Sequence, residues 1–275
     1  MRPEPDEGHE PIGLPAASRG RIRSARRLLR RKDRYASGTF LAEGPQSVRE
    51  ALAEPGRVED LFLTTAGLTR YPELAAAHPA PSLITDDELR TLTDAVTPQG
   101  VVAVCRMELR PVPELITGET RLLVCCARVS DPGNAGTVIR CADAFGADGV
   151  VLSAESVDPY NPKTVRATVG SLFHLPIGVG AEVPDVVDAA RAAGLQVLAA
   201  DGAGENLAAL TAAGELARPT LWLFGNEAHG LPADLARLAD RVVAVPIFGS
   251  AESLNLSTAA AVCLYASATA QHPTP

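Results

Sequence analysis

Residues 241–262, RVVAVPIFGSAESLNLSTAAAV, place a polar loop between two apolar segments. The run RVVAVPI is typical of a buried strand, and the residues after the loop predict a helix over 255–271 that is apolar nearly all round. The loop gathers five small or charged residues, namely Ser250, Glu252, Ser253, Asn255 and Ser257. A helix cap needs only one of them, Asn255 or Ser253, so capping alone does not explain the cluster. The apolar helix also predicts that a second subunit covers one of its faces.

The sequence on either side of this loop alternates strands and helices. Strands are expected at 121–127, 148–153, 173–178, 195–200, 220–225 and 241–247, and helices near 134–145, 163–168, 184–193, 233–239 and 255–271. The strands are almost wholly apolar, which is typical of a parallel sheet buried on both faces. The C-terminal part, residues 120–272, is therefore predicted to be an α/β domain.

The N-terminal part predicts a second, smaller unit. Helices near 21–32, 45–53, 71–77 and 86–92 alternate with strands at 39–44, 58–64, 81–85 and 100–105, which indicates a three-layer α/β domain over 18–108. Residues 109–119 lie in a proline-containing stretch without periodicity and are the candidate linker. Residues 1–17 begin with an acidic, proline-rich run and predict a disordered tail.

Composition and charge narrow the possible functions. The net charge is −8, yet residues 19–34 hold nine of the 25 basic residues and one acid. A local basic patch, rather than the total charge, attracts an RNA or DNA backbone, so we expect nucleic-acid contacts there. The alternative is a solvated amphipathic helix, and both interpretations can hold together. The candidate residues for these nucleic-acid contacts are Arg21, Arg23, Arg26, Arg27 and Arg30.

Other classes of protein find no support in the sequence. No apolar run is long enough to span a membrane, and the first residues show no apolar signal core. Five cysteines, an odd number without zinc-ligand spacing, favour buried thiols in a cytoplasmic protein that uses no metal. The fingerprints of dinucleotide-binding folds, P-loops and nucleophile elbows are also missing.

Two further loops could carry chemistry. In DPGNAGTVIRCADAFGADGVVL, residues 131–152, Asn134 is a candidate N-cap, and Arg140 lies roughly 160° from the apolar stripe of the helix. Arg140 therefore points toward solvent, a ligand or another chain, unless it only pairs with Asp143. In LWLFGNEAHGLP, residues 221–232, a buried strand runs into Gly225 and Glu227, where a ligand could approach the backbone. His229 is more simply an ordinary loop residue.

Together the three loops resemble the motifs of the SpoU (TrmH-like) family of SPOUT methyltransferases. NAGTVIRCADAFG is similar to the first motif, LFGNEAHG to the second and VPIFGSAESLNLS to the third, in the family's order and spacing across 118–275. The N-terminal part is similar to the family's substrate-binding domain, which has a ribosomal-protein-like α/β fold. The resemblance implies a C-terminal domain with a deep trefoil knot, an exception to unknotted chains.

The resemblance also implies an activity: transfer of a methyl group from S-adenosylmethionine to a ribose 2′-hydroxyl in structured RNA, with ribosomal RNA favoured, by a homodimer formed through the knotted domain. By motif position, the implied catalytic residues are Asn134, Arg140, Glu227, Ser253 and Asn255. The implied cofactor-binding residues are Leu223, Phe224, Gly225, Val245, Ile247 and Leu254. No metal is implied.

The role of the arginine follows from its chemistry. Arginine stays protonated in almost any protein site, so Arg140 is expected to bind phosphate and to stabilise the forming alkoxide rather than to remove a proton. The group that accepts the proton of the 2′-hydroxyl is then expected to be Glu227, Ser253 or the substrate phosphate. Alternative functions are methylation of transfer RNA, or RNA binding without catalysis on the same fold.

Overall fold

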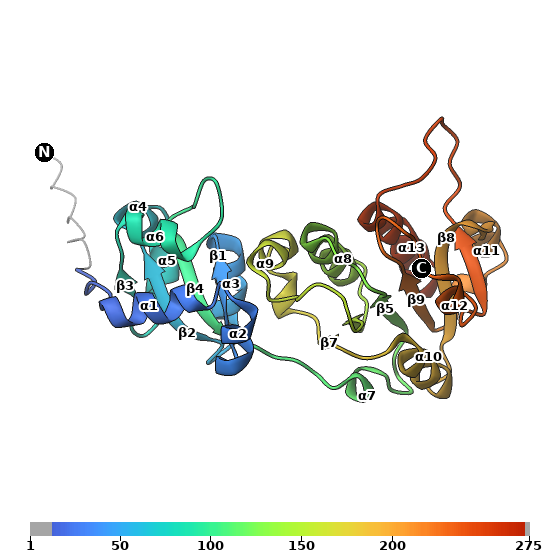
Figure 1. Cartoon of the computed structure of the whole chain (residues 1–275), viewed down its shortest axis with the longest axis horizontal. Helices are drawn as coiled ribbons and strands as arrows, with labels where there is room; N and C mark the ends of the chain where they lie inside the picture. The colour runs from blue at the N-terminus through green and yellow to red at the C-terminus, as the bar shows by residue number, and fades with distance from the viewer. Residues whose placement is uncertain (1–12, 273–275) are drawn as a thin grey trace, which may run out of the picture.

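The computed structural model describes residues 13–272, which form two β-sheets with helices packed on both faces (Figure 1). Most of the predicted tail, residues 1–12, lies outside the described residues. Its last part is ordered against the first sheet, because Ala17 donates a backbone hydrogen bond of 2.8 Å to Leu83 and the Pro15 carbonyl accepts one of 2.9 Å from Leu83.

The N-terminal domain holds a four-stranded sheet of order β1–β4–β2–β3. Pairing is antiparallel except between β2 and β3. Helices α1 and α6 cover one face with Ile22 and Leu89, and α3 and α5 cover the other with Val48 and Leu74, so the expected three layers are present. The elements are α1 (Arg19–Arg27), α2 (Arg31–Ser37), β1 (Thr39–Glu43), α3 (Pro45–Ala53), β2 (Val58–Leu63), α4 (Thr65–Arg70), α5 (Pro72–Ala76), β3 (Ser82–Leu83), α6 (Asp86–Leu92) and β4 (Val101–Arg106).

The basic helix predicted over 21–32 is two helices. Helix α1 ends at Arg27, and Arg30 has an extended backbone before α2 begins. The guanidinium of Arg34 accounts for the break, since it donates to the carbonyl oxygens of Leu28 and Leu29 at 2.9 and 3.1 Å, which have left the helical ladder.

The C-terminal domain holds a six-stranded sheet of order β10–β8–β9–β5–β6–β7, and every pair is parallel. Helices α8, α9, α11 and α13 cover one face and α10 and α12 the other. The elements are β5 (Leu122–Cys126), α8 (Pro132–Ala144), β6 (Gly149–Leu152), α9 (Pro162–Thr168), η1 (Ser171–Phe173), β7 (Ile177–Val179), α10 (Val183–Ala192), β8 (Gln196–Asn206), α11 (Leu207–Ala212), η2 (Glu215–Ala217), β9 (Thr220–Phe224), α12 (Ala233–Ala236), β10 (Arg241–Ala244) and α13 (Leu256–Gln271).

The apolar strands explain how the parallel sheet is buried. Successive side chains point to opposite faces, so Val124 joins the cluster beneath α8 and α13, while Leu123 and Cys125 join the cluster beneath α10. The parallel, doubly covered sheet predicted from the sequence is confirmed. Helix α11 was not predicted, and β7 is shorter than expected: η1 ends at Phe173, the first residue of the predicted range, and the strand begins only at Ile177.

The stretch between the two domains is packed rather than free. It contains α7 (Val112–Leu115), and both Leu115 and Ile116 are buried beside α10 and its sheet face. The domains also meet directly: the ring of Phe40 on β1 lies 4.6 Å from that of Tyr160 and 5.9 Å from that of Phe173. In Figure 1, α9 lies between the N-terminal domain and α8.

Candidate active site and RNA-binding surface

The first loop starts α8 three residues earlier than its predicted cap. Asp131 is the N-cap, and its Oδ1 accepts a hydrogen bond of 2.8 Å from the backbone N–H of Asn134. The prediction that Asn134 caps this helix is therefore wrong, because aspartate caps as well as asparagine and precedes a proline that is pre-organised for the first helical turn. The side chain of Asn134 is thereby free to contact the other two loops.

Glu227, in the second loop, is hydrogen-bonded to several residues of the first loop. Its carboxylate accepts hydrogen bonds from the N–H and Oγ of Ser130, the N–H of Asp131 and the side-chain amide of Asn134, at 3.1 to 3.2 Å. Partial burial acts to raise the pKa of Glu227, but the hydrogen bonds from backbone N–H groups and from Asn134 outweigh it and leave the pKa below its ordinary value. The carboxylate is therefore ionised at neutral pH and holds the loop together.

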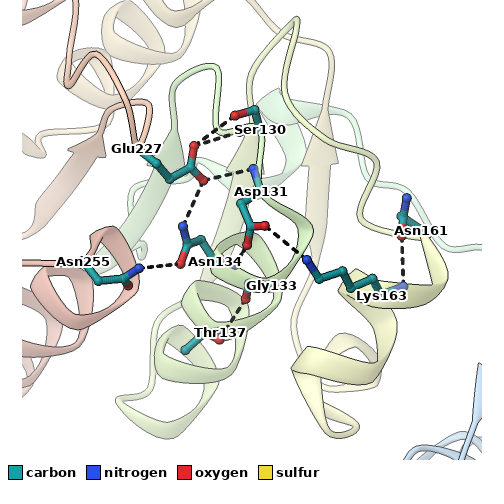
Figure 2. A network of polar contacts seen from close by, with 9 residues as sticks. All are labelled: Ser130, Asp131, Gly133, Asn134, Thr137, Asn161, Lys163, Glu227 and Asn255. Carbon is teal, nitrogen blue, oxygen red and sulfur yellow. Dashed lines mark hydrogen bonds and ion pairs between the residues drawn. The ribbon is translucent and has the colours of Figure 1, made fainter. Parts of the chain in front are cut away.

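Asn255 brings the third loop to the same point (Figure 2). Its Oδ1 accepts from the N–H of Ser257 at 2.9 Å, so Asn255 rather than Ser253 is the cap of α13, while its Nδ2 donates to Oδ1 of Asn134 at 3.0 Å. Asn134 thus donates to Glu227 and accepts from Asn255. Three segments that are far apart in the sequence meet in one continuous chain of hydrogen bonds.

A cavity of about 550 Å³ opens beside this network. Gly225 lies in its wall, where an added Cβ would come within 2.3 Å of the backbone nitrogen of Leu231 and 2.4 Å of the carbonyl carbon of Gly230. Only glycine allows this close packing of backbone on backbone. The long loop between β10 and α13, which projects from the sheet in Figure 1, supplies another wall, including Glu252 and Ser253.

Most of the predicted cofactor-binding residues line this cavity. They are Phe224, Gly225, Val245, Ile247 and Leu254. The sixth, Leu223, does not: it is fully buried in the cluster on the opposite face of the sheet, because alternate residues of a strand point in opposite directions.

Arg140 lies on the exposed side of α8. Its neighbours Val138, Ile139 and Ala142 are buried, so the predicted orientation away from the core is confirmed. Within residues 13–272 it forms no ion pair, and Asp143, its alternative partner, instead binds Nδ1 of His174 at 2.8 Å. Arg140 lies six positions after Asn134, which is about 9 Å along a helix axis.

Only some of the arginines predicted to bind RNA are exposed and unpaired within the described part of the chain. Arg23, Arg26 and Arg30 are exposed and form no ion pair with any described residue. Arg27 pairs with Asp33 at 3.2 Å, with its side chain 70% exposed. Arg21 is different: its guanidinium is held by Asp60 at 2.5 Å and Ser82 at 2.7 Å and lies over the Phe62 ring, so it anchors α1 to the sheet and is a poor candidate for RNA contact.

Two residues of the site were missed by the sequence analysis. Asp131 caps α8 and donates its backbone N–H to Glu227, and Lys163 on α9 lies 3.3 Å from the Asp131 carboxylate. The Asp-Pro-Gly turn was a usable signal for Asp131. Nothing in the local pattern marked Lys163, because its position depends on the packing of α9 against α8.

In the part of the chain that the structure describes, no three His, Cys, Asp or Glu side chains are grouped as a metal site. None of the helices among residues 13–272 combines the length and the apolar character that a membrane span needs.

Two family models match separate parts of the chain. The model of the SpoU rRNA Methylase family matches residues 121–265, and that of the MRM3-like substrate binding domain matches residues 19–103. Both agree with the division of the chain into two sheets.

Individual relatives match along nearly the whole length. The chain is 36% identical over 252 residues to the 23S rRNA (guanosine(2553)-2′-O)-methyltransferase RlmP of Bacillus subtilis, covering 92% of this chain and 97% of the relative. It is 35% identical over 268 residues to the 23S rRNA (uridine(2479)-2′-O)-methyltransferase of Streptomyces viridochromogenes, covering 91% and 92%. Among solved structures, the AdoMet-bound rRNA methyltransferase from Sinorhizobium meliloti superposes with a TM-score of 0.79 at 32% identity, covering 92% and 96%.

Proposed function

Because the chain belongs to the SpoU rRNA methylase family, we propose that it transfers the methyl group of S-adenosylmethionine to a ribose 2′-hydroxyl of ribosomal RNA. The observation that carries the proposal is the hydrogen-bonded chain Glu227–Asn134–Asn255 at the rim of a cavity about 550 Å³ in volume. It joins the three loops on which this chemistry depends in the family. The two relatives above are named for ribosomal RNA, which favours that substrate over transfer RNA.

The cavity fits the proposed cofactor. Its apolar walls, which include Val245, Ile247 and Leu254, suit an adenosine and a thioether chain, and the backbone around Gly225 can approach a ligand closely. Asp201 and Glu252 also line the cavity and offer negative charge to a ligand that carries positive charge. S-adenosylmethionine, when bound, supplies a methyl group that is already activated by its positively charged sulfur.

The chain's own residues then position the ribose and stabilise charge. Arg140 is exposed and unpaired within the described residues, so its guanidinium can bind a substrate phosphate and stabilise the negative charge that develops on the attacking oxygen. Glu227 is a positioning residue, since a carboxylate with a lowered pKa and four hydrogen-bond donors is a weak base. Ser253 and Asn255 are exposed at the rim, where the hydroxyl proton can leave to water.

The two domains have different proposed roles. We assign substrate binding to residues 18–108, a packed connection to 109–119 and catalysis to 120–272. Arg23, Arg26, Arg27 and Arg30 form the exposed face of the basic helix and its end, and they would bind RNA phosphates in a salt-dependent way. Arg21 is left out of this set because Asp60 holds it.

The quaternary structure proposed is a homodimer through the C-terminal domain. Apolar side chains are exposed along α13 and its preceding loop, with Val262 at 37%, Tyr265 at 60% and Phe248 at 95%. A second copy of the chain would cover them and place its own loops near Arg140. The trefoil knot of the family is proposed for the same segment. Because the proposed substrate is ribosomal RNA, as it is for the bacterial relatives, we also propose that the protein works in the cytoplasm.

A methyl-transfer assay tests the proposal. Wild type, Arg140→Ala and the control Arg90→Ala, which alters an exposed pair on α6, are incubated with labelled S-adenosylmethionine and either unmodified ribosomal RNA or transfer RNA. We expect wild type and the control to label only ribosomal RNA, as an alkali-resistant ribose, and Arg140→Ala to lose most of the activity. Labelling of transfer RNA alone would reassign the substrate. Tight binding of cofactor and RNA without any transfer would favour a non-catalytic RNA-binding protein.

A further inference from the structure

We infer that Lys163 binds a backbone phosphate of the RNA beside the target ribose, on the side of the site that faces the N-terminal domain. The inference rests on the proposed function and adds a substrate-positioning residue to it. Lys163 lies outside the three loops that resemble the family motifs, and it is placed next to them only by the fold.

Lys163 extends the polar network by one further contact (Figure 2). Its Nζ lies 3.3 Å from Oδ2 of Asp131, and the backbone N–H of Asp131 donates to Oε1 of Glu227 at 3.1 Å. The polar side chains thus form a row across the start of α8, from Asn255 on one side, through Asn134 and Asp131, to Lys163 on the other.

The negative charges in this row would repel an RNA phosphate unless a cation lay close to them. A phosphodiester next to the reacting ribose would meet two carboxylates, Asp131 and Glu227, which repel it. Arg140 can offset this repulsion on one side, but it lies about 9 Å along α8 from Asn134. Among the described residues, Lys163 is the cation that is bonded to the row itself.

Lys163 can exchange its present partner for a phosphate. Its side chain is 55% exposed and that of Asp131 is 44% exposed, and exposed ion pairs of this kind contribute little to stability. The cap on α8 does not depend on Lys163, because Asp131 caps through its other oxygen. A lysine carries a compact charge on a flexible stem, so it can move from the carboxylate to an incoming phosphate without moving the helix.

The helix that carries Lys163 is fixed on both sides. Toward the active site, α9 packs so closely on α8 that a Cβ on Gly136 would lie 2.5 Å from the carbonyl oxygen of Thr164. Toward the N-terminal domain, Arg166 binds Glu43 at 3.1 Å and also contacts Asp94. Lys163 is therefore carried by a helix that is held between the N-terminal domain and the catalytic network.

The test compares Lys163→Met with Asp131→Asn and with Arg191→Met. Arg191 lies on α10, on the opposite face of the sheet, and pairs with Asp240 at a distance of 2.8 Å. Arg191→Met is the matched control, because it also removes one positive charge. The probe is unmodified 23S ribosomal RNA made by transcription. RNA binding and initial methylation rates are measured between 50 and 200 mM salt, together with cofactor affinity and thermal stability.

For Lys163→Met we expect RNA affinity to fall about tenfold at low salt and the plot of log affinity against log salt concentration to become shallower by about one. Cofactor affinity and thermal stability should not change. Asp131→Asn should keep or raise RNA affinity, because asparagine still caps α8 and Lys163 is released. Arg191→Met should match wild type.

An unchanged salt slope in Lys163→Met, or equal losses of RNA affinity in Lys163→Met and Asp131→Asn, would show that the pair is only structural and would overturn the inference. Failure of the wild type to methylate RNA would count against the proposed function alone, since the phosphate contact is still measured by binding.

Discussion

Arg34 of the N-terminal domain and Asp158 of the C-terminal domain form an ion pair inside the interface between them. The two side chains are 3% and 5% exposed, and Nε of Arg34 lies 3.1 Å from Oδ2 of Asp158. Asp158 also accepts a hydrogen bond from the hydroxyl of Tyr35 at 3.3 Å, while Arg34 caps the end of α1 through Leu28. One arginine therefore fixes both the end of the basic helix and the position of that helix relative to the active site.

Removing this arginine should cost much more than removing an exposed one. In Arg34→Met the carboxylate of Asp158 stays buried without its partner, and breaking a buried pair in this way costs about 3–5 kcal/mol. The free energy of unfolding from urea titrations measures the loss. Arg90→Met breaks the exposed pair with Asp87, at 68% and 92% exposure, and should change little. Equal effects of the two substitutions would contradict a stabilising role for the interface pair.

Gly225 and Gly249 both line the cavity but should respond differently to alanine. A Cβ on Gly225 would lie within 2.5 Å of backbone atoms of residues 230 and 231, whereas nothing lies within 4 Å of a Cβ on Gly249. Gly225→Ala should therefore distort the loop and abolish binding of S-adenosylmethionine, measured by calorimetry. Gly249→Ala should bind nearly as the wild type does. Normal binding by Gly225→Ala would show that the cofactor does not depend on this wall.

The stability of the protein should depend on pH through His174. Its ring joins Asp143 on α8, at 2.8 Å, to Glu50 on α3, at 3.2 Å. The hydrogen bond to Asp143, aided by the one to Glu50, raises the pKa of His174 above its ordinary value of 6.5 despite partial burial. A raised pKa in the folded state stabilises the protein fully below about pH 6.5, and the contribution is lost as the pH rises through the folded-state pKa.

His174→Gln should therefore lower the free energy of unfolding at pH 6 and have a smaller effect at pH 9. His272→Gln, at the exposed end of α13, is the control and should follow the wild type at both values. A constant difference between His174→Gln and wild type across this range would show that the contacts act without titration of the ring.

The sequence was sufficient for most of the helices and strands and for the three loops. Apolar strands such as 121–127 and 220–225 carry a strong signal, because a parallel strand that is buried on both faces has no polar positions. The direction of Arg140 also followed from helical periodicity alone. The cap of α8 was harder to predict. Asp131 and Asn134 are both good cap residues, and only the structure shows which one starts the helix.

Contacts between distant segments could not be read from local pattern. Arg21 and Arg23 look alike in the basic run, yet only Arg21 meets the carboxylate of Asp60, 39 positions away. Leu223 and Phe224 are neighbours in one strand, yet only Phe224 lines the cavity. In both cases the deciding fact is the face on which the folded chain places a side chain.

The side chain of Asn255 makes two different contacts, so substitutions at this residue can separate an effect on stability from an effect on activity. Its Oδ1 caps α13, and its Nδ2 donates to Asn134. Asn255→Asp keeps an oxygen for the cap, where a negative charge is favourable, so stability should be preserved. Asn255→Ala loses the cap and should cost about 1 kcal/mol of stability.

Both variants remove the donor to Asn134, whose amide cannot turn to compensate because it donates to Glu227. Methyl transfer should therefore fall in both, and in Asn255→Asp the new carboxylate oxygen also faces the Asn134 oxygen across the former hydrogen bond. Urea titration and single-turnover rates measured on the same preparations separate the two effects. A fully active Asn255→Asp would mean that the loop needs Asn255 only as a cap, and that the polar residues around it serve the cofactor alone.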